Sequence, residues 1–460
     1  MLTRQHCLVG VASILLLAAQ AEPVPNQHIL NVPYQSDSEP LPLLGQLWRF
    51  GVGEDTKTLK EVLALAKEHD LDLWQIAPTH VDVYSPNSAP TLPASLRAIP
   101  HTLAANITHP QRATTSRLQS TAAWDLSSLQ NSTYHANYHP LYEVETFIRE
   151  LAELHPDLVK VNNLGHSGMG REMLSLTISK PQAVTNKGRK TQRQGKKKKK
   201  PERQPEDDEK LAIVIMGAQH AREWVATATA LYLTHALTSK KSEPRSLSRL
   251  LDVFDFHIIP MPNPDGYNYT WESDRYWYKT RQRMGSKNKC FGLDMNRNWG
   301  YKWKAIAEES SSGHRPFEAP EANNIANMII TIPNLVGFID LRSYGQMLSS
   351  PYSYSCNAMP EDAEDQLEAG LGAARAMGSV HGTKVTTGRL CEMLYRAPGN
   401  VVDWMYRGAG IKYSYALHLR DTGTYGFSLP PRWIRPVGEE TSEMLRYLAK
   451  FIAKKMKRDL

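Results

Sequence analysis

The stretch LAIVIMGAQHAREWVATATALYLTHAL, residues 211–237, determines the fold class of this chain. Residues 211–218 form a continuous apolar run, which is typical of a strand that is buried on both faces of a sheet. After a short polar turn, residues 223–237 form an apolar segment that is long enough for a helix. A buried strand followed directly by a helix predicts an α/β domain.

From Tyr134 to the C-terminus, predicted strands and helices alternate on both sides of this stretch. The further apolar strands are predicted at 173–179, 253–261, 335–341 and 411–419. The further helices are predicted at 142–156, 320–330, 362–379 and 438–457. This alternation predicts one α/β domain over residues 121–460, with a charged insertion at 187–210.

Residues 22–120 have a different pattern. LWRFGV at 47–52 is predicted to be a strand, a helical stretch follows at 58–71, and DLWQIA and VDVYS are predicted to be further short strands. This order predicts a small α+β domain. The segment 102–130, which is rich in Ser, Thr and Ala and weakly patterned, is predicted to be a linker.

Residues 1–21 have the features of a secretory signal peptide. Arg4 supplies the positive charge, residues 8–19 supply the apolar run, and Ala-Gln-Ala at 19–21 supplies a cleavage site. The run is short for a membrane span, and no later segment reaches that length. We therefore expect a secreted chain without a transmembrane span.

The sequons and cysteines agree with a secretory route. Sequons for N-glycosylation begin at Asn106, Asn131 and Asn268. Three cysteines remain after removal of the signal peptide, so one disulfide bond can form and one thiol is left. Cys356 and Cys391 flank a helical segment and are the favoured pair, whereas Cys290 has no obvious partner.

The positive charge is concentrated in one segment. The chain has 54 Lys and Arg against 47 Asp and Glu, a formal net charge of +7. Residues 187–203 alone carry +9, so the rest of the chain carries −2. We therefore expect no nucleic-acid partner. The basic run is predicted to be a solvated loop, and the alternative is contact with an anionic polymer or a membrane surface.

The polar turn after the first strand holds a candidate metal site. His220 and Glu223 supply an imidazole and a carboxylate, both of which zinc binds; the alternative is an ordinary surface pair. Three further motifs follow it: PNPDGY at 262–267, GLDMNRNW at 292–299 and LRDTGTYGF at 419–427. In this order, they resemble the secreted zinc metallocarboxypeptidases of the carboxypeptidase A/B type, from about Tyr134 to the end.

This resemblance implies a fold and a set of residue roles. The fold would be a mixed eight-stranded sheet flanked by helices, preceded by an activation propeptide. Zn²⁺ would be bound by His220 and Glu223. Among the substrate-binding residues, Asn296 and Arg297 would clamp a terminal carboxylate, and Tyr395 would be a mobile cap. Arg222 and Arg275 would be secondary binding arginines. Val402 would lie at the floor of a pocket for apolar C-terminal side chains.

Three positions depart from the family pattern. Arg342 occupies the position of the third zinc ligand, and its guanidinium has no lone pair to give to a metal. Tyr278 replaces an oxyanion-stabilising arginine, and His418 replaces the general-base glutamate. Peptide hydrolysis by this route needs an activated water, a base and oxyanion stabilisation. Their joint replacement predicts an inactive protein.

These replacements are similar to those in fungal inactive metallocarboxypeptidases linked to cell wall organisation. That branch implies zinc and a destination outside the cell or in the vacuole. We expect a monomeric pseudoenzyme that binds peptide C-termini or protein partners, with 187–203 as a candidate contact for an anionic cell-wall polymer. One alternative is a weakly active zinc carboxypeptidase that releases apolar C-terminal residues with His418 as base. Another is a scaffold with a vestigial cleft.

Two hypotheses describe the altered metal position. In the first, Arg342 pairs with Glu223 and takes the electrostatic place of the metal, because two cations in a partly desolvated pocket repel each other. In the second, His418 joins His220 and Glu223 as a third zinc ligand. A simpler interpretation of His418 is a buried histidine with a structural role.

Overall fold

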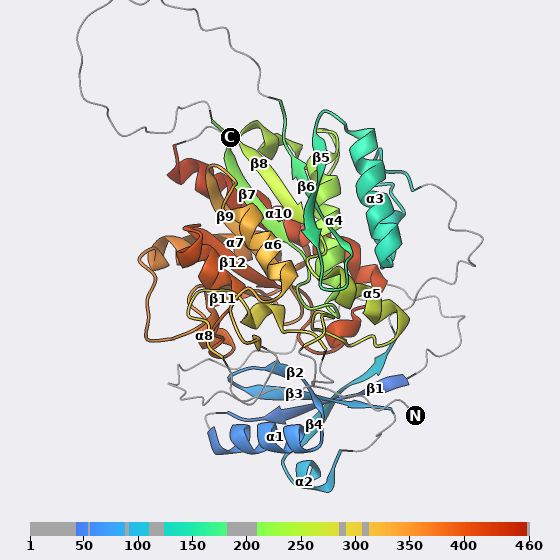
Figure 1. The fold of residues 1–460 in the computed structure, drawn as a ribbon, viewed down its shortest axis with the longest axis vertical. Helices are drawn as coiled ribbons and strands as arrows, with labels where there is room; N and C mark the ends of the chain where they lie inside the picture. Colours follow the sequence, from blue (N-terminus) through green and yellow to red (C-terminus); the bar gives the residue numbers. More distant parts are fainter. Residues whose placement is uncertain are drawn as a thin grey trace, which may run out of the picture.

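The chain folds into a small N-terminal sheet and a larger α/β domain, and Figure 1 shows the small sheet against one end of the larger domain. The computed structural model describes residues 43–53, 56–87, 92–109, 124–181, 209–284, 291–305 and 312–457. The predicted signal peptide, Cys290 and the basic run 187–203 lie outside the described residues.

The larger domain contains the predicted mixed eight-stranded sheet, with strand order β11-β10-β12-β9-β7-β8-β6-β5. At its centre, β7 pairs in parallel with both β8 and β9, and all six residues of β7 are buried. The strands are β5 (Val159–His166), β6 (Glu172–Ile178), β7 (Leu211–Met216), β8 (Phe254–Ile259), β9 (Leu335–Arg342), β10 (Met347–Ser350), β11 (Thr386–Arg389) and β12 (Tyr413–His418).

Helices cover both faces of this sheet. Ile213 and Ile215 of β7 face a core that includes α3, α4, α7 and α10, whereas Val214 and Met216 face a second core that includes α6. Within the described ranges, no helix combines the length and apolarity that a bilayer crossing requires. The helices are α3 (Leu141–Leu154), α4 (Trp224–Thr238), α5 (Pro264–Glu272), α6 (Pro320–Ile329), α7 (Ala363–His381), α8 (Leu390–Met393), α9 (Val401–Asp403) and α10 (Ile434–Lys455).

Six helices and strands of this domain were not predicted, and two of them, α8 and α9, are only four and three residues long. β5 is a half-exposed edge strand whose sequence shows little apolar alternation, and β10 and β11 are each four residues long. The helix α5 starts inside the PNPDGY motif, where Asn263 accepts a hydrogen bond from the backbone N–H of Gly266. Weak periodicity and short length explain these omissions.

The N-terminal domain is an antiparallel sheet of order β2-β3-β1-β4. The prediction of a linker over 102–130 was wrong at both ends. Residues 101–108 form β4, an edge strand in which Ile107 is the one fully buried residue, and Leu126 and Leu129 are buried in the core of the larger domain. The elements are β1 (Leu43–Gly51), α1 (Thr56–Glu68), β2 (Asp72–Ile76), β3 (His80–Pro86), α2 (Ala94–Arg97) and β4 (His101–Thr108).

The two domains share a buried polar contact. Asp82 of β3 is fully buried and accepts two hydrogen bonds from Arg49, each 2.7 Å long. The Tyr344 hydroxyl of the larger domain donates a third hydrogen bond to Asp82, at 2.9 Å. Arg49 in turn donates to the backbone oxygen of Thr422, at 2.9 Å. The buried carboxylate therefore accepts hydrogen bonds from both domains, two from Arg49 of its own domain and one from Tyr344 of the larger domain.

An aromatic cluster surrounds this polar contact. Trp74 of β2 packs against Tyr276 and Phe427 of the larger domain, with ring centroids 4.9 and 5.0 Å apart. Gly426 allows this approach, because a Cβ added there would lie 2.6 Å from the Trp74 ring. The N-terminal domain thus covers aromatic side chains that belong to the larger domain.

Candidate functional site

The candidate site lies where three neighbouring parallel strands end. β7 leads into the turn that carries His220 and Glu223, β9 ends at Arg342, and β12 ends at His418. β9 pairs with both other strands, and Arg342 lies opposite His418 in their register. The strand order therefore brings together residues from three distant parts of the sequence.

Arg342 and Glu223 form a buried, two-pronged ion pair. The Nε of Arg342 donates to Oε2 of Glu223 at 2.9 Å, and its Nη2 donates to Oε1 at 3.0 Å. The backbone N–H of Ser343 also donates to Oε2, at 3.1 Å. Both side chains are almost completely buried. The pairing that the first hypothesis predicts is therefore present.

His220 is held between Arg342 and Asp294. Nη2 of Arg342 lies 2.6 Å from Nδ1 of His220, and Nε2 of His220 lies 2.9 Å from Oδ1 of Asp294. Nδ1 also lies 3.1 Å from Oε1 of Glu223. Because a guanidinium can only donate, we assign the neutral tautomer in which Nδ1 accepts from Arg342 and Nε2–H donates to Asp294. The lone pair of Nδ1 therefore points at Arg342. The edge of the Tyr278 ring contacts the imidazole, at 5.3 Å between centroids.

Asp340 lies on the other side of the guanidinium. Its Oδ2 accepts from Gln219 at 2.9 Å and is 3.4 Å from Nη1 of Arg342. Oδ1 is buried and has no hydrogen-bond partner among the described residues. Burial raises the pKa of Asp340 to about 7, although the charge of Arg342 opposes that rise.

The electrostatics of Glu223 and Arg342 are complementary. Burial alone would raise the pKa of Glu223, but the charge of Arg342 brings this pKa down to about 2. Burial would lower the pKa of Arg342, and the negative charges of Glu223 and Asp340 raise it instead. Both groups are therefore charged across the physiological pH range.

These residues do not fit a zinc site. Zinc needs free lone pairs from three or four ligands, and here Nδ1 of His220 and both oxygens of Glu223 accept hydrogen bonds from Arg342. The third-ligand position is a cation. Among the described ranges, no group of three His, Cys, Asp or Glu side chains is placed to hold a metal ion. We therefore derive no chemical step through zinc.

His418 lies beside this centre. Its Nδ1 is buried and has no hydrogen-bond partner in the described part of the chain. Burial and the positive charge of Arg342 lower the pKa of His418 to about 3. The imidazole is therefore neutral at pH 7 and a weak base.

Arg297 is held differently from Arg342. Its Nη2 donates to the Tyr395 hydroxyl at 2.7 Å, and its Nη1 donates to the backbone oxygen of Asn296 at 2.9 Å. Both Arg297 and Tyr395 are half-buried. Within the described residues, Arg297 forms no ion pair with a carboxylate at salt-bridge distance. The structure therefore places Tyr395, the predicted cap, against Asn296 and Arg297, the two residues of the predicted carboxylate clamp.

The loop that carries Tyr395 is fixed against the clamp. The side chain of Asn296 accepts a hydrogen bond from the backbone N–H of Val401 at 3.1 Å. Gly399 has a φ of 74°, and a Cβ added there would lie 2.6 Å from the backbone oxygen of Arg297. Val402 is fully buried in the second core, against which Tyr395 also packs. Its predicted role at the floor of a specificity pocket stays a prediction.

The other two predicted binding arginines are engaged inside the protein. Nη1 of Arg222 donates to Asp72 of the N-terminal domain at 2.5 Å, and its guanidinium lies over the Phe427 ring. Arg275 donates to the backbone oxygens of Arg222 and Phe427, at 2.8 and 2.5 Å. Their roles toward a substrate stay predictions.

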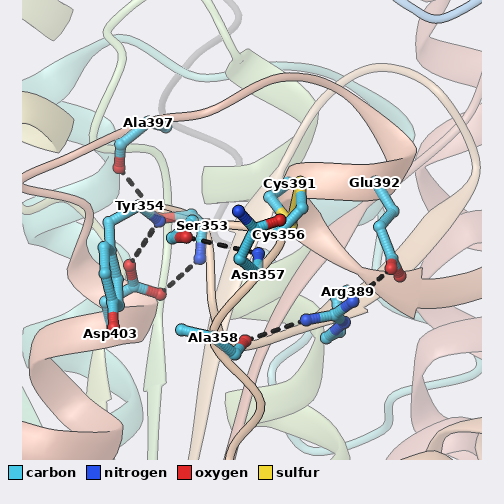
Figure 2. The surroundings of a disulfide bond; sticks show 11 residues. Ser353, Tyr354, Cys356, Asn357, Ala358, Arg389, Cys391, Glu392, Ala397 and Asp403 are labelled. Atoms are coloured by element: carbon cyan, nitrogen blue, oxygen red, sulfur yellow. Dashed lines mark hydrogen bonds and ion pairs between the residues drawn. A yellow bond between two sulfur atoms is a disulfide. The ribbon is translucent and has the colours of Figure 1, made fainter. Parts of the chain in front are cut away.

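The predicted disulfide bond between Cys356 and Cys391 is confirmed, with 5.5 Å between the Cα atoms. Figure 2 shows Asp403 nearby, and it accepts hydrogen bonds from the backbone N–H groups of Ser353 and Tyr354 at 2.7 and 2.9 Å. The bond and this carboxylate hold the segment before α7 close to the loop that carries Tyr395.

The three sequons differ in exposure. Asn106 and Asn131 are exposed, whereas Asn268 is half-buried in α5. The hydroxyl of Thr270, the third residue of that sequon, is buried and donates to the backbone oxygen of Tyr267 at 2.6 Å. Glycosylation at all three stays a prediction.

Three acidic groups of the site were not predicted from the sequence. Asp294 orients His220, Asp340 lies beside Arg342, and Asp72 binds Arg222 from the other domain. Asp294 belongs to the GLDMNRNW motif and stands two residues before Asn296, so its position in that motif was a sequence signal. No sequence signal pointed to Asp340 or Asp72.

The sequence is similar to those of known zinc carboxypeptidases and of their inactive relatives. A family model described as zinc carboxypeptidase matches residues 144–444. The chain is 31% identical to the inactive metallocarboxypeptidase ECM14 of Ajellomyces dermatitidis, over 86% of this chain and 70% of that protein.

Two solved structures are also similar to the chain. The crystal structure of thrombin activatable fibrinolysis inhibitor shares 29% identity and a TM-score of 0.73, and covers 90% of this chain and 99% of that one. The bovine protein of the same name, in complex with tick carboxypeptidase inhibitor, shares 32% identity and a TM-score of 0.60. That match covers 70% of this chain and all of the other.

Proposed function

The chain belongs to the zinc carboxypeptidase family, and we propose that it is a pseudoenzyme that binds the C-terminal carboxylate of a peptide or protein partner without cleaving it. The observation that carries this proposal is the Arg297 guanidinium. It is half-buried, oriented by neutral oxygens of Asn296 and Tyr395, and without an ion-paired acid among the described residues. A planar guanidinium in this state is suited to a carboxylate.

The altered positions support the absence of hydrolysis. His418 stands at the general-base position, and with a pKa of about 3 it would take a proton from water poorly at pH 7. Tyr278 offers one neutral hydroxyl in place of a charged guanidinium. Arg342 already occupies the lone pairs that would bind an activating metal. The relatives named inactive metallocarboxypeptidase agree with this interpretation.

Binding to a free C-terminus is the first measurement. We expect a fluorescent peptide that ends in an apolar residue with a free carboxylate to bind more tightly than the same peptide with a C-terminal amide. Arg297→Gln removes the charge and should abolish this preference, whereas Arg375→Gln, on the exposed face of α7, should keep it. Equal binding of the acid and the amide by the unaltered chain would contradict the proposal.

The N-terminal domain could affect peptide binding, so the binding measurement is made with and without its covalent link to the larger domain. Asp72 of β2 binds Arg222, so the domain lies against one of the predicted secondary binding residues. The measurement is therefore made with the full chain and repeated after cleavage at a protease site introduced within 110–123. A carboxylate preference in either form supports the proposal, and its absence from both forms contradicts it.

A weakly active peptidase is the alternative function. It would require turnover of peptides with apolar C-terminal residues, and a chelator would abolish that turnover. Release of the C-terminal amino acid is measured by mass spectrometry over long incubation. His418→Gln is the matched variant, because a base at this position must titrate and glutamine cannot.

We further propose that the chain acts as a monomer in the secretory route, outside the cell or in the vacuole, with a role in cell wall organisation. The signal-peptide pattern and the exposed sequons at Asn106 and Asn131 support the secretory route, and the cell wall role rests on the resemblance of the altered positions to those of fungal inactive metallocarboxypeptidases. Treatment of the cellular protein with an endoglycosidase should increase its mobility on a gel. Deletion of 187–203 should release the protein from the wall if this run contacts an anionic polymer.

The complex of the bovine relative with tick carboxypeptidase inhibitor supports a protein as partner. A partner would need an accessible C-terminus. Cross-linking of the wild type and the Arg297→Gln variant in the same cells distinguishes a partner held by its carboxylate from one bound elsewhere.

A further inference from the structure

We infer that the Arg342 guanidinium is a built-in replacement for the metal ion, so that His220 and Glu223 bind this side chain and not zinc. The inference concerns the metal state of the chain and does not depend on the proposed partner.

Arg342 takes up the lone pairs that a metal ion would need at this centre. The three atoms that could ligate a metal here are Nδ1 of His220 and the two carboxylate oxygens of Glu223. Arg342 donates to all three, at 2.6, 3.0 and 2.9 Å. An ion bound to the same atoms would have to displace every one of these hydrogen bonds.

The permanent positive charge of Arg342 disfavours a metal ion at this centre. The guanidinium keeps its positive charge at every accessible pH, and the Arg342 side chain is only 6% exposed. A divalent cation a few ångströms away would be repelled strongly in this setting. Glu223, with Asp340 beside it, already supplies the negative charge that stabilises Arg342. The centre is therefore satisfied without a metal.

Neighbouring hydrogen bonds orient His220 and Glu223 toward Arg342. Asp294 accepts a hydrogen bond from Nε2 of His220, which fixes the tautomer so that Nδ1 offers its lone pair toward Arg342. The backbone N–H of Ser343 fixes one oxygen of Glu223 in the same way. The supporting groups of a metal site are thus in place, and one side chain at the end of β9 decides which cation they hold.

The deciding experiment compares the full wild-type chain with Arg342→His, which restores a third neutral ligand. Each protein is dialysed against a chelator, loaded with Zn²⁺ or Co²⁺, and analysed for metal content, thermal unfolding and the visible absorption of Co²⁺. We expect the wild type to retain almost no metal and to unfold at the same temperature with and without zinc. Arg342→His should bind about one zinc per chain and unfold at a higher temperature with zinc than without it.

A control separates the rebuilt site from an added surface ligand. Arg375→His places a new histidine on the exposed face of α7 and should gain no zinc at this centre. Wild type that carries about one zinc per chain, with a loss of thermal stability on chelation, would overturn the inference. A folded Arg342→His variant that binds no zinc would overturn it as well.

A second variant keeps the inference testable if Arg342→His is recovered unfolded. Glu223→Gln removes the charge of the pair and leaves the size of the side chain nearly unchanged. If Arg342 is the resident cation, this change lowers the unfolding temperature equally with a chelator and with zinc. A difference between wild type and variant that exists only in the presence of zinc would instead assign the metal to Glu223.

Discussion

Arg342 and Arg297 come from two neighbouring parts of the same site and differ in their partners. Arg342 is almost completely buried and donates to Glu223, His220 and Asp340. Arg297 is half-buried and donates to the neutral oxygens of Tyr395 and Asn296. An arginine whose charge is balanced inside the protein is part of the fold, whereas an arginine held by neutral oxygens keeps its charge available for a ligand.

The largest expected difference is in stability. Arg342→Ala leaves Glu223 charged and buried without a partner, and loss of one member of a buried pair costs about 3–5 kcal/mol of the free energy of unfolding. Arg297→Ala leaves no buried acid unpaired, and we expect a cost below about 1 kcal/mol. Denaturant unfolding of both variants measures this difference. Equal losses of the free energy of unfolding in the two variants would contradict the different roles assigned to Arg342 and Arg297.

The next effect is on binding. Arg297→Gln should weaken the complex with a free C-terminus by roughly 30- to 160-fold, because about 2–3 kcal/mol of charge-assisted hydrogen bonding is lost. Stability should be unchanged. Titration of a labelled peptide into both proteins checks the effect, and the amide-ended peptide should show no difference between them.

The pH dependence separates the two regions further. His418, beside Arg342, has a pKa near 3 in the folded chain, below its unfolded value near 6.5. The unfolded chain therefore takes up the proton first, and stability is lost as the pH falls below 6.5. Between pH 7 and 5 we expect a loss of about 1–2 kcal/mol from this residue.

The matched variant for this prediction is His418→Gln. The free energy of unfolding is measured at pH 7 and at pH 5 in both proteins, and the wild type should lose more than the variant. Identical losses would show that His418 is solvated and titrates normally in the folded chain.

The smallest effect concerns Tyr395. Tyr395→Phe removes one hydrogen bond to Arg297 and should change peptide affinity by a factor of about 2 to 10, which corresponds to about 0.5–1.5 kcal/mol. The stability of the Arg342 centre should not change. Isothermal titration and thermal unfolding of the same sample measure both. A large loss of stability would mean that the Tyr395 loop belongs to the core.

Much of the fold followed from local patterns. The apolar run 211–218 and the helix after it predicted the centre of the sheet, because a strand buried on both faces needs apolar residues at every position. Elements such as β4 and β10 show no clear alternation of apolar and polar residues, so the sequence pattern does not identify them. The disulfide between Cys356 and Cys391 was predicted because these two cysteines flank a helical segment, whereas Cys290 has no obvious partner.

The sequence by itself determined which chemical groups stand at the altered positions: a guanidinium at 342, a phenol at 278 and an imidazole at 418. It also determined that Arg342 cannot ligate a metal, because that property belongs to the side chain alone. The tertiary structure decided what these groups do. The order and register of β7, β9 and β12 place Arg342 on Glu223 and His220, and they bury Arg342 and Glu223 almost completely. Hydrogen bonds and pKa values depend on distance and burial, and only the folded chain sets these quantities for residues so far apart in sequence.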